Sequence, residues 1–325
     1  MVSLKRKLIV LLMAILTIIS FTKINVSADE EEIFLGGMPA GFALYTRGAE
    51  IVGLCDVITD NGAISPSKDA ELIVGDKILY LDGEQINTAN DLEKTLKSNN
   101  SRTITINRQG ETIIKKITPA KDINGKYKLG LLIRDEVNGI GTITFIKGNK
   151  FASLGHAVLN NDGKPFEILG GNLYDCTITG CIKGERGKAG ELRGVFLRNE
   201  KIAKIEKNNI FGVYGTIDKI DKNNLIKTEI GEAKPGKAQI ISTIDGVTPK
   251  KYNISIIKID NNSTYKNFVI KITDENLLNT TGGIVQGMSG SPIIQNDKLV
   301  GAVTHVFIND PTRGFGLSIN KMLNQ

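Results

Sequence analysis

The sequence predicts a mainly β protein in which a small α+β domain precedes a larger, closed β architecture. The first indication is that short runs of β-branched residues recur between Gly, Asn and Asp, with 35 glycines among 325 residues. The second is that no long amphipathic pattern interrupts these runs after Gly130. These features predict many short strands rather than a helical bundle.

The first 28 residues have the organisation of a secretory signal. A basic Lys5-Arg6-Lys7 precedes the apolar run from Leu8 to Phe21, and Val26-Ser27-Ala28 is a small-residue cleavage site. The run has about 14 residues, fewer than the roughly 20 that cross a bilayer comfortably as a helix. We therefore expect a signal peptide over residues 1–28, with an uncleaved N-terminal anchor as the alternative, and an exported chain.

Residues 33–120 are predicted to form the small domain. Leu35–Leu44 is a Gly-rich turn that leads into an apolar strand. Ala70–Ile86 alternates apolar and polar residues around Asp82-Gly83, which is a strong hairpin signal.

A helix and a second hairpin complete this domain. Thr88–Lys97 is the predicted helix, because Thr88 can cap it with Asp91 three residues on, and an apolar face contains Ala89, Leu92 and Leu96. The hairpin is expected from Arg102–Ile106 and Thr112–Ile117.

The second domain is predicted to span residues 139–325. A linker is expected over residues 121–138, because the stretch from Ala120 to Lys128 is polar. The predicted strands beyond it are Ile140–Ile146, Cys176–Ile182, Val195–Leu197, Ala238–Ile244, Tyr252–Ile259, Asn267–Ile272, Pro292–Ile294 and Leu299–Phe307.

Charge and cysteine content exclude several classes of protein. The formal net charge is +6, but no block of Lys and Arg is interleaved with aromatic residues, so no nucleic-acid partner is expected. A weak attraction to an anionic membrane surface is the more modest interpretation. The three cysteines, Cys55, Cys176 and Cys181, are too few for a disulfide scaffold, although Cys176 and Cys181 could pair locally. With two histidines and no CxxC pair, neither a metal site nor a cofactor is expected.

The hexapeptide from Gly287 to Pro292, Gly-Met-Ser-Gly-Ser-Pro, is the most informative motif. A nucleophilic serine needs an exposed hydroxyl on a tight turn, with backbone N–H groups nearby for an oxyanion. The motif matches the G-x-S-G-x-P loop of chymotrypsin-like peptidases, which makes Ser289 the candidate nucleophile and assigns the oxyanion hole to the N–H groups of Gly287 and Ser289. A plain Gly/Ser turn between strands is the alternative.

The histidines of the chain favour a catalytic role for Ser289 over a plain turn. A serine nucleophile needs a base that titrates near neutral pH, and only His156 and His305 are available. His156 precedes Ser289, as the chain order His, Asp, Ser of chymotrypsin-like enzymes requires, so it is the candidate base. His305 lies in a strand similar to the one that lines the specificity pocket of such enzymes, and it is expected to face the substrate groove or to pack locally.

Spacing does not identify an acidic third member. The aspartates between His156 and Ser289 include Asp162, Asp175, Asp218, Asp221, Asp260 and Asp274.

Longer runs connect the chain to a family. The segments that carry the resemblance are Leu129–Asp135, Gly139–Phe145, Leu154–His156, Lys188–Gly194, Thr273–Leu278, Thr281–Pro292, Gly301–Phe307 and Asn309–Pro311. Through them the chain resembles the stage IV sporulation protein B (SpoIVB) peptidases of spore-forming Firmicutes, in which a PDZ domain precedes a chymotrypsin-like double β-barrel serine peptidase.

The resemblance implies a triad of Ser289, His156 and Asp274. It also implies a signalling endopeptidase that is secreted from the forespore into the space between the two sporulation membranes. There it would cleave membrane-associated regulatory proteins and its own N-terminal segment.

A PDZ domain binds a peptide as an added strand and holds the terminal carboxylate with the amides of a Gly-rich loop. Gly41, Phe42, Ala43 and Leu44 are expected to supply this loop, and Leu92 and Leu96 to wall the groove. The alternative is that Phe42 and Leu44 are only core residues of the small domain. The groove is expected to hold either an internal segment or the C-terminus of a partner.

Two functions remain open from the sequence. The first is the signalling peptidase. The second is a catalytically silent, PDZ-based binding scaffold in the same intermembrane space.

Overall fold

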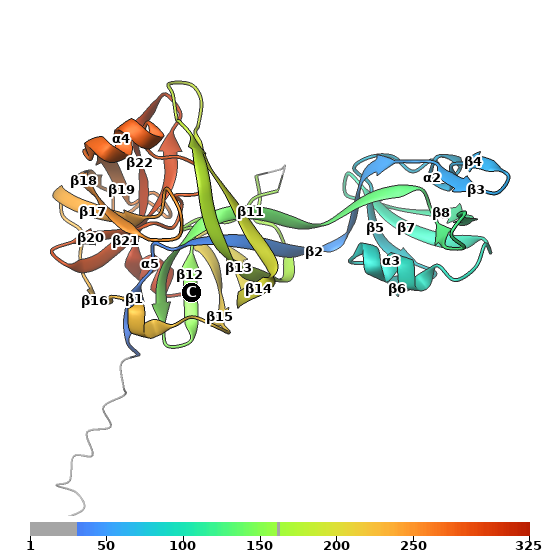
Figure 1. The fold of residues 1–325 in the computed structure, drawn as a ribbon, viewed down its shortest axis with the longest axis horizontal. Helices are drawn as coiled ribbons and strands as arrows, with labels where there is room; N and C mark the ends of the chain where they lie inside the picture. The colour runs from blue at the N-terminus through green and yellow to red at the C-terminus, as the bar shows by residue number, and fades with distance from the viewer. Residues whose placement is uncertain (1–30, 161–162) are drawn as a thin grey trace, which may run out of the picture. The chain divides into compact units, whose positions relative to one another are not determined.

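The computed structural model describes residues 31–160 and 163–325 (Figure 1). The chain is mainly β, as predicted. The predicted signal peptide, residues 1–28, lies outside the described residues. Within the described part of the chain, no helix is long and apolar enough to cross a membrane.

Six antiparallel strands form a first closed circuit of pairings. In order around the circuit they are β2 (Pro39–Leu54), β13 (Ile168–Ile182), β14 (Glu191–Asn209), β15 (Gly212–Ile217), β12 (Lys150–Ser153) and β11 (Leu131–Lys147), which pairs again with β2. Buried apolar side chains such as Phe42, Ile143, Phe151 and Leu173 form the core of this circuit. Each strand of the circuit has a paired neighbour on both sides over part of its length.

A second circuit of six antiparallel strands follows along the chain. It runs through β17 (Gly236–Ser242), β18 (Lys250–Ile259), β19 (Phe268–Ile272), β22 (Asp310–Ser318), β21 (Lys298–Phe307) and β20 (Pro292–Gln295), which pairs with β17. Its core contains Ile240, Ile254, Ile270 and Ile293. The remaining elements of this part are β1 (Ile33–Leu35), η1 (Lys222–Asn224), β16 (Lys227–Ile230), α4 (Glu275–Thr281) and α5 (Ile319–Leu323).

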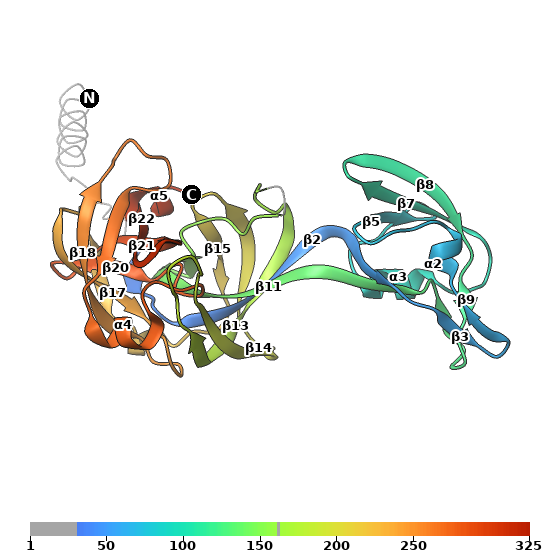
Figure 2. The ribbon, with the colours of Figure 1, turned by 90° about the horizontal axis from the view of Figure 1, so that it is seen from above.

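Residues 48–135 form a small module, drawn in blue to green in Figure 2. It has an apolar core of its own. It contains the ends of β2 and β11 together with β3 (Val57–Thr59), β4 (Gly62–Ile64), α2 (Pro66–Asp69), β5 (Lys77–Leu81), β6 (Glu84–Gln85), α3 (Ala89–Thr95), β7 (Arg102–Arg108), β8 (Glu111–Ile117), β9 (Ala120–Lys121) and β10 (Tyr127–Lys128). Its core combines helix residues such as Leu92 with strand residues such as Ile78 and Ile104.

Local sequence signals in this module are confirmed. Thr88 caps α3, and its side chain and that of Asp91 form the predicted capping box. The turn at Asp82 and Gly83 has φ values of 51° and 82°, as a two-residue hairpin requires, and it joins β5 to β6. The second predicted hairpin is β7–β8.

The predicted domain boundaries are wrong in two places. The first residues of the proposed small domain belong to the first circuit, because Pro39–Thr46 pairs with β11 and β13. The proposed linker, residues 121–138, contains β9, β10 and the start of β11, and Leu129 is buried in the core of the small module. Two long strands, β2 and β11, therefore run through both regions.

The three cysteines are free thiols, so Cys176 and Cys181 do not form the local bridge that the sequence left open. Burial raises the pKa of the Cys176 thiol to about 11, and the charge of Asp175 contributes to the increase. Cys176 therefore acts as an apolar core residue at neutral pH.

Candidate active site

The Ser289 turn lies between α4 and β20 and is held against the first circuit. Gly287 and Gly290 have φ values of +95° and +94°, a region that favours glycine. A Cβ atom on Gly290 would lie 2.1 Å from the carbonyl oxygen of Thr142 and 2.5 Å from the nitrogen of Leu154. Glycine at this position therefore allows the nucleophile turn to touch the loop that carries His156.

Thr142 on β11 fixes this turn through main-chain and side-chain bonds. Its N–H donates to the Ser289 carbonyl at 3.0 Å, and its hydroxyl donates to the Gly287 carbonyl at 2.9 Å. Among the described residues, the N–H groups of Gly287 and Ser289 donate no hydrogen bond, whereas those of Met288 and Gly290 are both paired. Two backbone donors next to the serine are thus available to an oxyanion.

The His156 loop follows β12 and turns sharply before the histidine. Leu154 and Gly155 have φ values of +67° and +68°, and the Gly155 N–H donates to the Ser153 carbonyl at 2.8 Å. The His156 Nδ1 atom lies 2.8 Å from the Ala157 carbonyl oxygen. Because a carbonyl only accepts, Nδ1 carries the hydrogen, and Nε2 is left as the basic nitrogen.

Burial lowers the pKa of His156 below its ordinary value, and the hydrogen bond to Ala157 opposes this change in part. The imidazole is therefore neutral at pH 7. A neutral imidazole is the form that can accept a proton from a serine hydroxyl.

Ser289 and His156 line the same cavity, which has a volume of about 620 Å³. The predicted oxyanion residue Gly287 and the predicted groove residue His305 line it as well. The Ser289 hydroxyl donates to the Thr304 carbonyl at 2.7 Å instead of to His156. Catalytic hydrogen bonds often form only when substrate is bound, so attack requires the hydroxyl to leave Thr304 and turn to the imidazole.

His305 contacts the candidate base directly. The centroids of the His305 and His156 rings are 4.7 Å apart, and the planes are tilted by 39°. The Nδ1 atom of His305 is buried and has no hydrogen-bond partner among the described residues. The place of His305 in the cavity wall agrees with the predicted groove position, and its contact with substrate stays a prediction.

The structure does not place Asp274 beside His156, in contrast to the triad that the resemblance implied. Asp274 is the N-cap of α4, where its carboxylate accepts from the Leu277 N–H at 3.1 Å and from the Asn253 N–H at 3.1 Å. It does not line the cavity of Ser289. A short acidic side chain at a helix start satisfies orphan N–H groups, and this capping role accounts for the place of Asp274 in the structure.

Asp274→Ala is therefore expected to lower the free energy of unfolding but to have little effect on the reactivity of Ser289. Loss of an N-cap typically costs about 1 kcal/mol of the free energy of unfolding, which urea denaturation measures. Labelling of Ser289 by a fluorophosphonate probe should stay within about threefold of wild type. Asp274→Asn should recover only part of this stability, because its single amide oxygen can accept from the Leu277 N–H or from the Asn253 N–H but not from both. A loss of labelling of about 10⁴-fold, as expected for a triad aspartate, would restore Asp274 to the triad.

The predicted carboxylate-binding loop is also misplaced. Gly41, Phe42, Ala43 and Leu44 lie within β2, where they pair with β11 and β13. Phe42 and Leu44 are buried in the core of the first circuit. The alternative that they are core residues is therefore correct, but they do not belong to the core of the small domain as it assumed.

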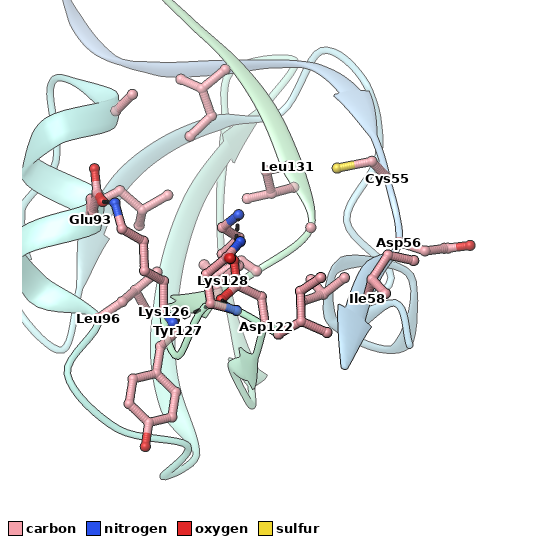
Figure 3. A pocket seen from close by; sticks show the side chains of 18 residues that line it. Cys55, Asp56, Ile58, Glu93, Leu96, Asp122, Lys126, Tyr127, Lys128 and Leu131 are labelled. Carbon is pink, nitrogen blue, oxygen red and sulfur yellow. Dashed lines mark hydrogen bonds and ion pairs between the residues drawn. The ribbon is translucent and has the colours of Figure 1, made fainter. Parts of the chain in front are cut away.

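A second groove lies in the small module and has a volume of about 520 Å³ (Figure 3). The predicted wall residues Leu92 and Leu96 line it from α3 and its C-cap, and Leu131 and Ile133 line it from β11. Two ion pairs lie at the groove, Lys126 with Glu93 at 2.7 Å and Lys128 with Asp122 at 2.7 Å.

Sequence reasoning missed Thr142 and Thr304 at the catalytic cavity. The bond from Thr142 to Gly287 joins residues 145 positions apart. Both threonines lie in segments that carry the family resemblance, but nothing in those segments assigns either of them to the cavity. Thr304 could have been suspected only from its place directly before His305.

The fold and this site define a serine peptidase. The family model for SpoIVB peptidase S55 matches residues 125–323, and the chain belongs to that family. Among solved structures, the Rv3671c protease of M. tuberculosis is similar. Its inactive form is 13% identical over 57% of this chain and 82% of that chain, with a TM-score of 0.34.

The active form of the same protease is 14% identical over 58% of this chain and 73% of that chain, also with a TM-score of 0.34. A comparison with curated proteins gave no match.

Proposed function

We propose that this serine peptidase is a sporulation signalling endopeptidase, exported across the forespore membrane into the space between forespore and mother cell. Its substrates there are membrane-associated regulatory proteins and its own N-terminal segment. Membership of the SpoIVB peptidase family supports the proposal. The observation that carries the chemistry is one cavity lined by Ser289, His156 and Gly287.

The reaction follows from this arrangement. The Ser289 Oγ atom attacks the scissile carbonyl while Nε2 of His156 takes the hydroxyl proton. The Gly287 and Ser289 N–H groups stabilise the negative oxygen of the tetrahedral intermediate. His156 then gives the proton to the leaving amine, and water hydrolyses the acyl-enzyme by the same steps in reverse order.

The proposed catalytic domain is a chymotrypsin-like double β-barrel. Two closed circuits of six antiparallel strands support it. The base and the nucleophile come from different circuits, His156 after β12 and Ser289 before β20. Such an arrangement lets two rigid scaffolds each position one reacting group.

The small module is proposed to be a PDZ domain whose carboxylate-binding loop is Lys128–Leu131. Among the described residues, the N–H groups of Leu129 and Gly130 donate no hydrogen bond. The Gly130 carbonyl accepts from the Cys55 N–H at 3.0 Å and from the Ser67 hydroxyl at 2.9 Å, which fixes the loop.

An extended peptide can add to β11 beside this loop. In the described pairings, Leu131–Arg134 pairs with β2 alone, so one edge of this strand segment is open toward the groove. Free amides next to an open strand edge favour a peptide with a terminal carboxylate, and hence the C-terminus of a partner over an internal segment. The module thus recruits substrate at the sporulation membranes.

N-terminal sequencing of the protein from sporulating cells tests the proposed function. The wild type should begin beyond residue 28 and show a further, self-made cut, whereas Ser289→Ala should show signal removal alone and should block spore formation. Lys128→Glu, an exposed change at the groove, should keep the self-made cut but delay sporulation. Normal sporulation with Ser289→Ala would establish the silent scaffold instead.

A further inference from the structure

The group that orients His156 is a peptide bond. With Asp274 engaged at α4, the acceptor for the Nδ1 hydrogen of His156 is the Ala157 carbonyl, at 2.8 Å. This carbonyl belongs to the peptide group between Ala157 and Val158. A peptide group is planar and nearly always trans, so its C=O and N–H point in opposite directions as one rigid unit.

Asn208 holds the other end of the same peptide group. Its Oδ1 atom accepts from the Val158 N–H at 2.9 Å. The Nδ2 atom donates to the Val158 carbonyl at 3.0 Å and to the Phe166 carbonyl at 3.1 Å. This assignment of the amide oxygen and nitrogen satisfies all three partners, because an N–H faces Oδ1 and two carbonyls face Nδ2.

Strand pairing connects Asn208 to the segment that leads to His156. Asn208 lies near the end of β14 and pairs with Val213 of β15. Val213 in turn pairs with Ser153 of β12, directly before the turn that leads to His156.

We propose that Asn208 is a positioning residue that acts on His156 through the Ala157–Val158 peptide group. This rests on the proposed role of His156 as the base. When Nε2 takes the proton from Ser289, the positive imidazolium strengthens the bond from Nδ1–H to the Ala157 carbonyl. The bond from Val158 N–H to Asn208 is polarised in the same direction, because hydrogen bonds in a chain reinforce one another.

Three variants of the full-length protein test the proposal. Asn208→Ala removes all three bonds, and Asn208→Asp keeps an acceptor for the Val158 N–H. Asn209→Ala is the matched control, because the neighbouring amide contacts Phe211 and Gln325 instead. Each is assayed with a fluorescent casein for kcat and KM and with a fluorophosphonate probe for the reactivity of Ser289.

Asn208→Ala is expected to lower kcat by about 10–100-fold, the range known for residues that orient a working histidine, with little change in KM. Asn208→Asp should recover part of the loss, and Asn209→Ala should match wild type. The acidic limb of the pH–rate profile should move to lower pH in Asn208→Ala, since a weaker acceptor at Nδ1 disfavours the imidazolium.

A spectroscopic measurement separates positioning from general damage. Histidine labelled with ¹⁵N gives only two side-chain systems, because the chain has only His156 and His305. In the wild type His156 should be the Nδ1–H tautomer, and Asn208→Ala should show a mixture of tautomers. Should Asn208→Ala not fold, the tautomer and kcat of Asn208→Asp decide the question in its place.

Wild-type kcat in Asn208→Ala, or an unchanged tautomer despite lost activity, would overturn the proposal. A wild type that cleaves nothing would instead refute the proposed peptidase function, and the tautomer measurement would still report on Asn208.

Discussion

Ser289→Ala is expected to lower kcat by about 10⁴–10⁶-fold, and His156→Ala by a similar factor. Alanine at position 289 removes the nucleophile, and alanine at position 156 removes the acceptor for its proton. Both side chains line the same cavity, and in the proposed mechanism they act as one unit. The double variant should therefore be no slower than either single variant, as measured by casein cleavage.

Ser291→Ala provides the matched control for this result. Its hydroxyl is buried and donates to the Ser242 hydroxyl at 3.0 Å, so its loss costs stability but leaves the cavity unchanged. Urea denaturation should show Ser289→Ala folded as well as wild type. Additive losses in the double variant, or cleavage that survives Ser289→Ala, would assign the chemistry to other residues.

Local signals in the sequence predicted local structure well. A capping box fixed the start of α3, and Asp82-Gly83 fixed a hairpin, because each depends on residues within a few positions of one another. The Ser289 turn was predictable for the same reason, since its glycines are adjacent to it. The prediction that Ser289 and His156 share one site follows from the small number of histidines in the chain.

Properties that depend on long-range pairing could not be predicted in this way. An apolar, Gly-rich run such as Gly41–Leu44 suits a strand in a closed circuit as well as a loop of a small domain. Only its pairing with β11 and β13 shows that it is a strand of the first circuit. Asp274 is the opposite case, because a local property of the sequence determines its place. It caps the start of α4, and its nearness to Ser289 in the sequence does not bring it to His156. Asn208 carries no motif, and its contacts appear only when β14 lies beside the His156 loop.

Acidification is expected to unfold this protein and to stop its chemistry over adjoining ranges of pH. Burial, aided by the nearby charges of His156 and Lys266, lowers the pKa of His305 from 6.5 to about 4. An unfolded chain therefore binds more protons than the folded one between these values, so the free energy of unfolding rises with pH there. The stabilisation is complete above about pH 6.5 and is lost as the pH falls toward about 4.

The activity depends on the other member of this histidine pair. Burial also lowers the pKa of His156, so the acidic limb of kcat/KM should lie below pH 6.5 and fall tenfold per unit of pH beneath it. Urea denaturation between pH 4 and 7 measures stability, and fluorophosphonate labelling follows the base. His305→Gln should flatten the dependence of stability on pH, because it removes one of the two titrating rings, while the labelling rate keeps an acidic limb set by His156. A stability that stays constant from pH 7 to 4 would mean that both imidazoles are protonated as easily in the folded protein as in water, and the buried, neutral base would then be untenable.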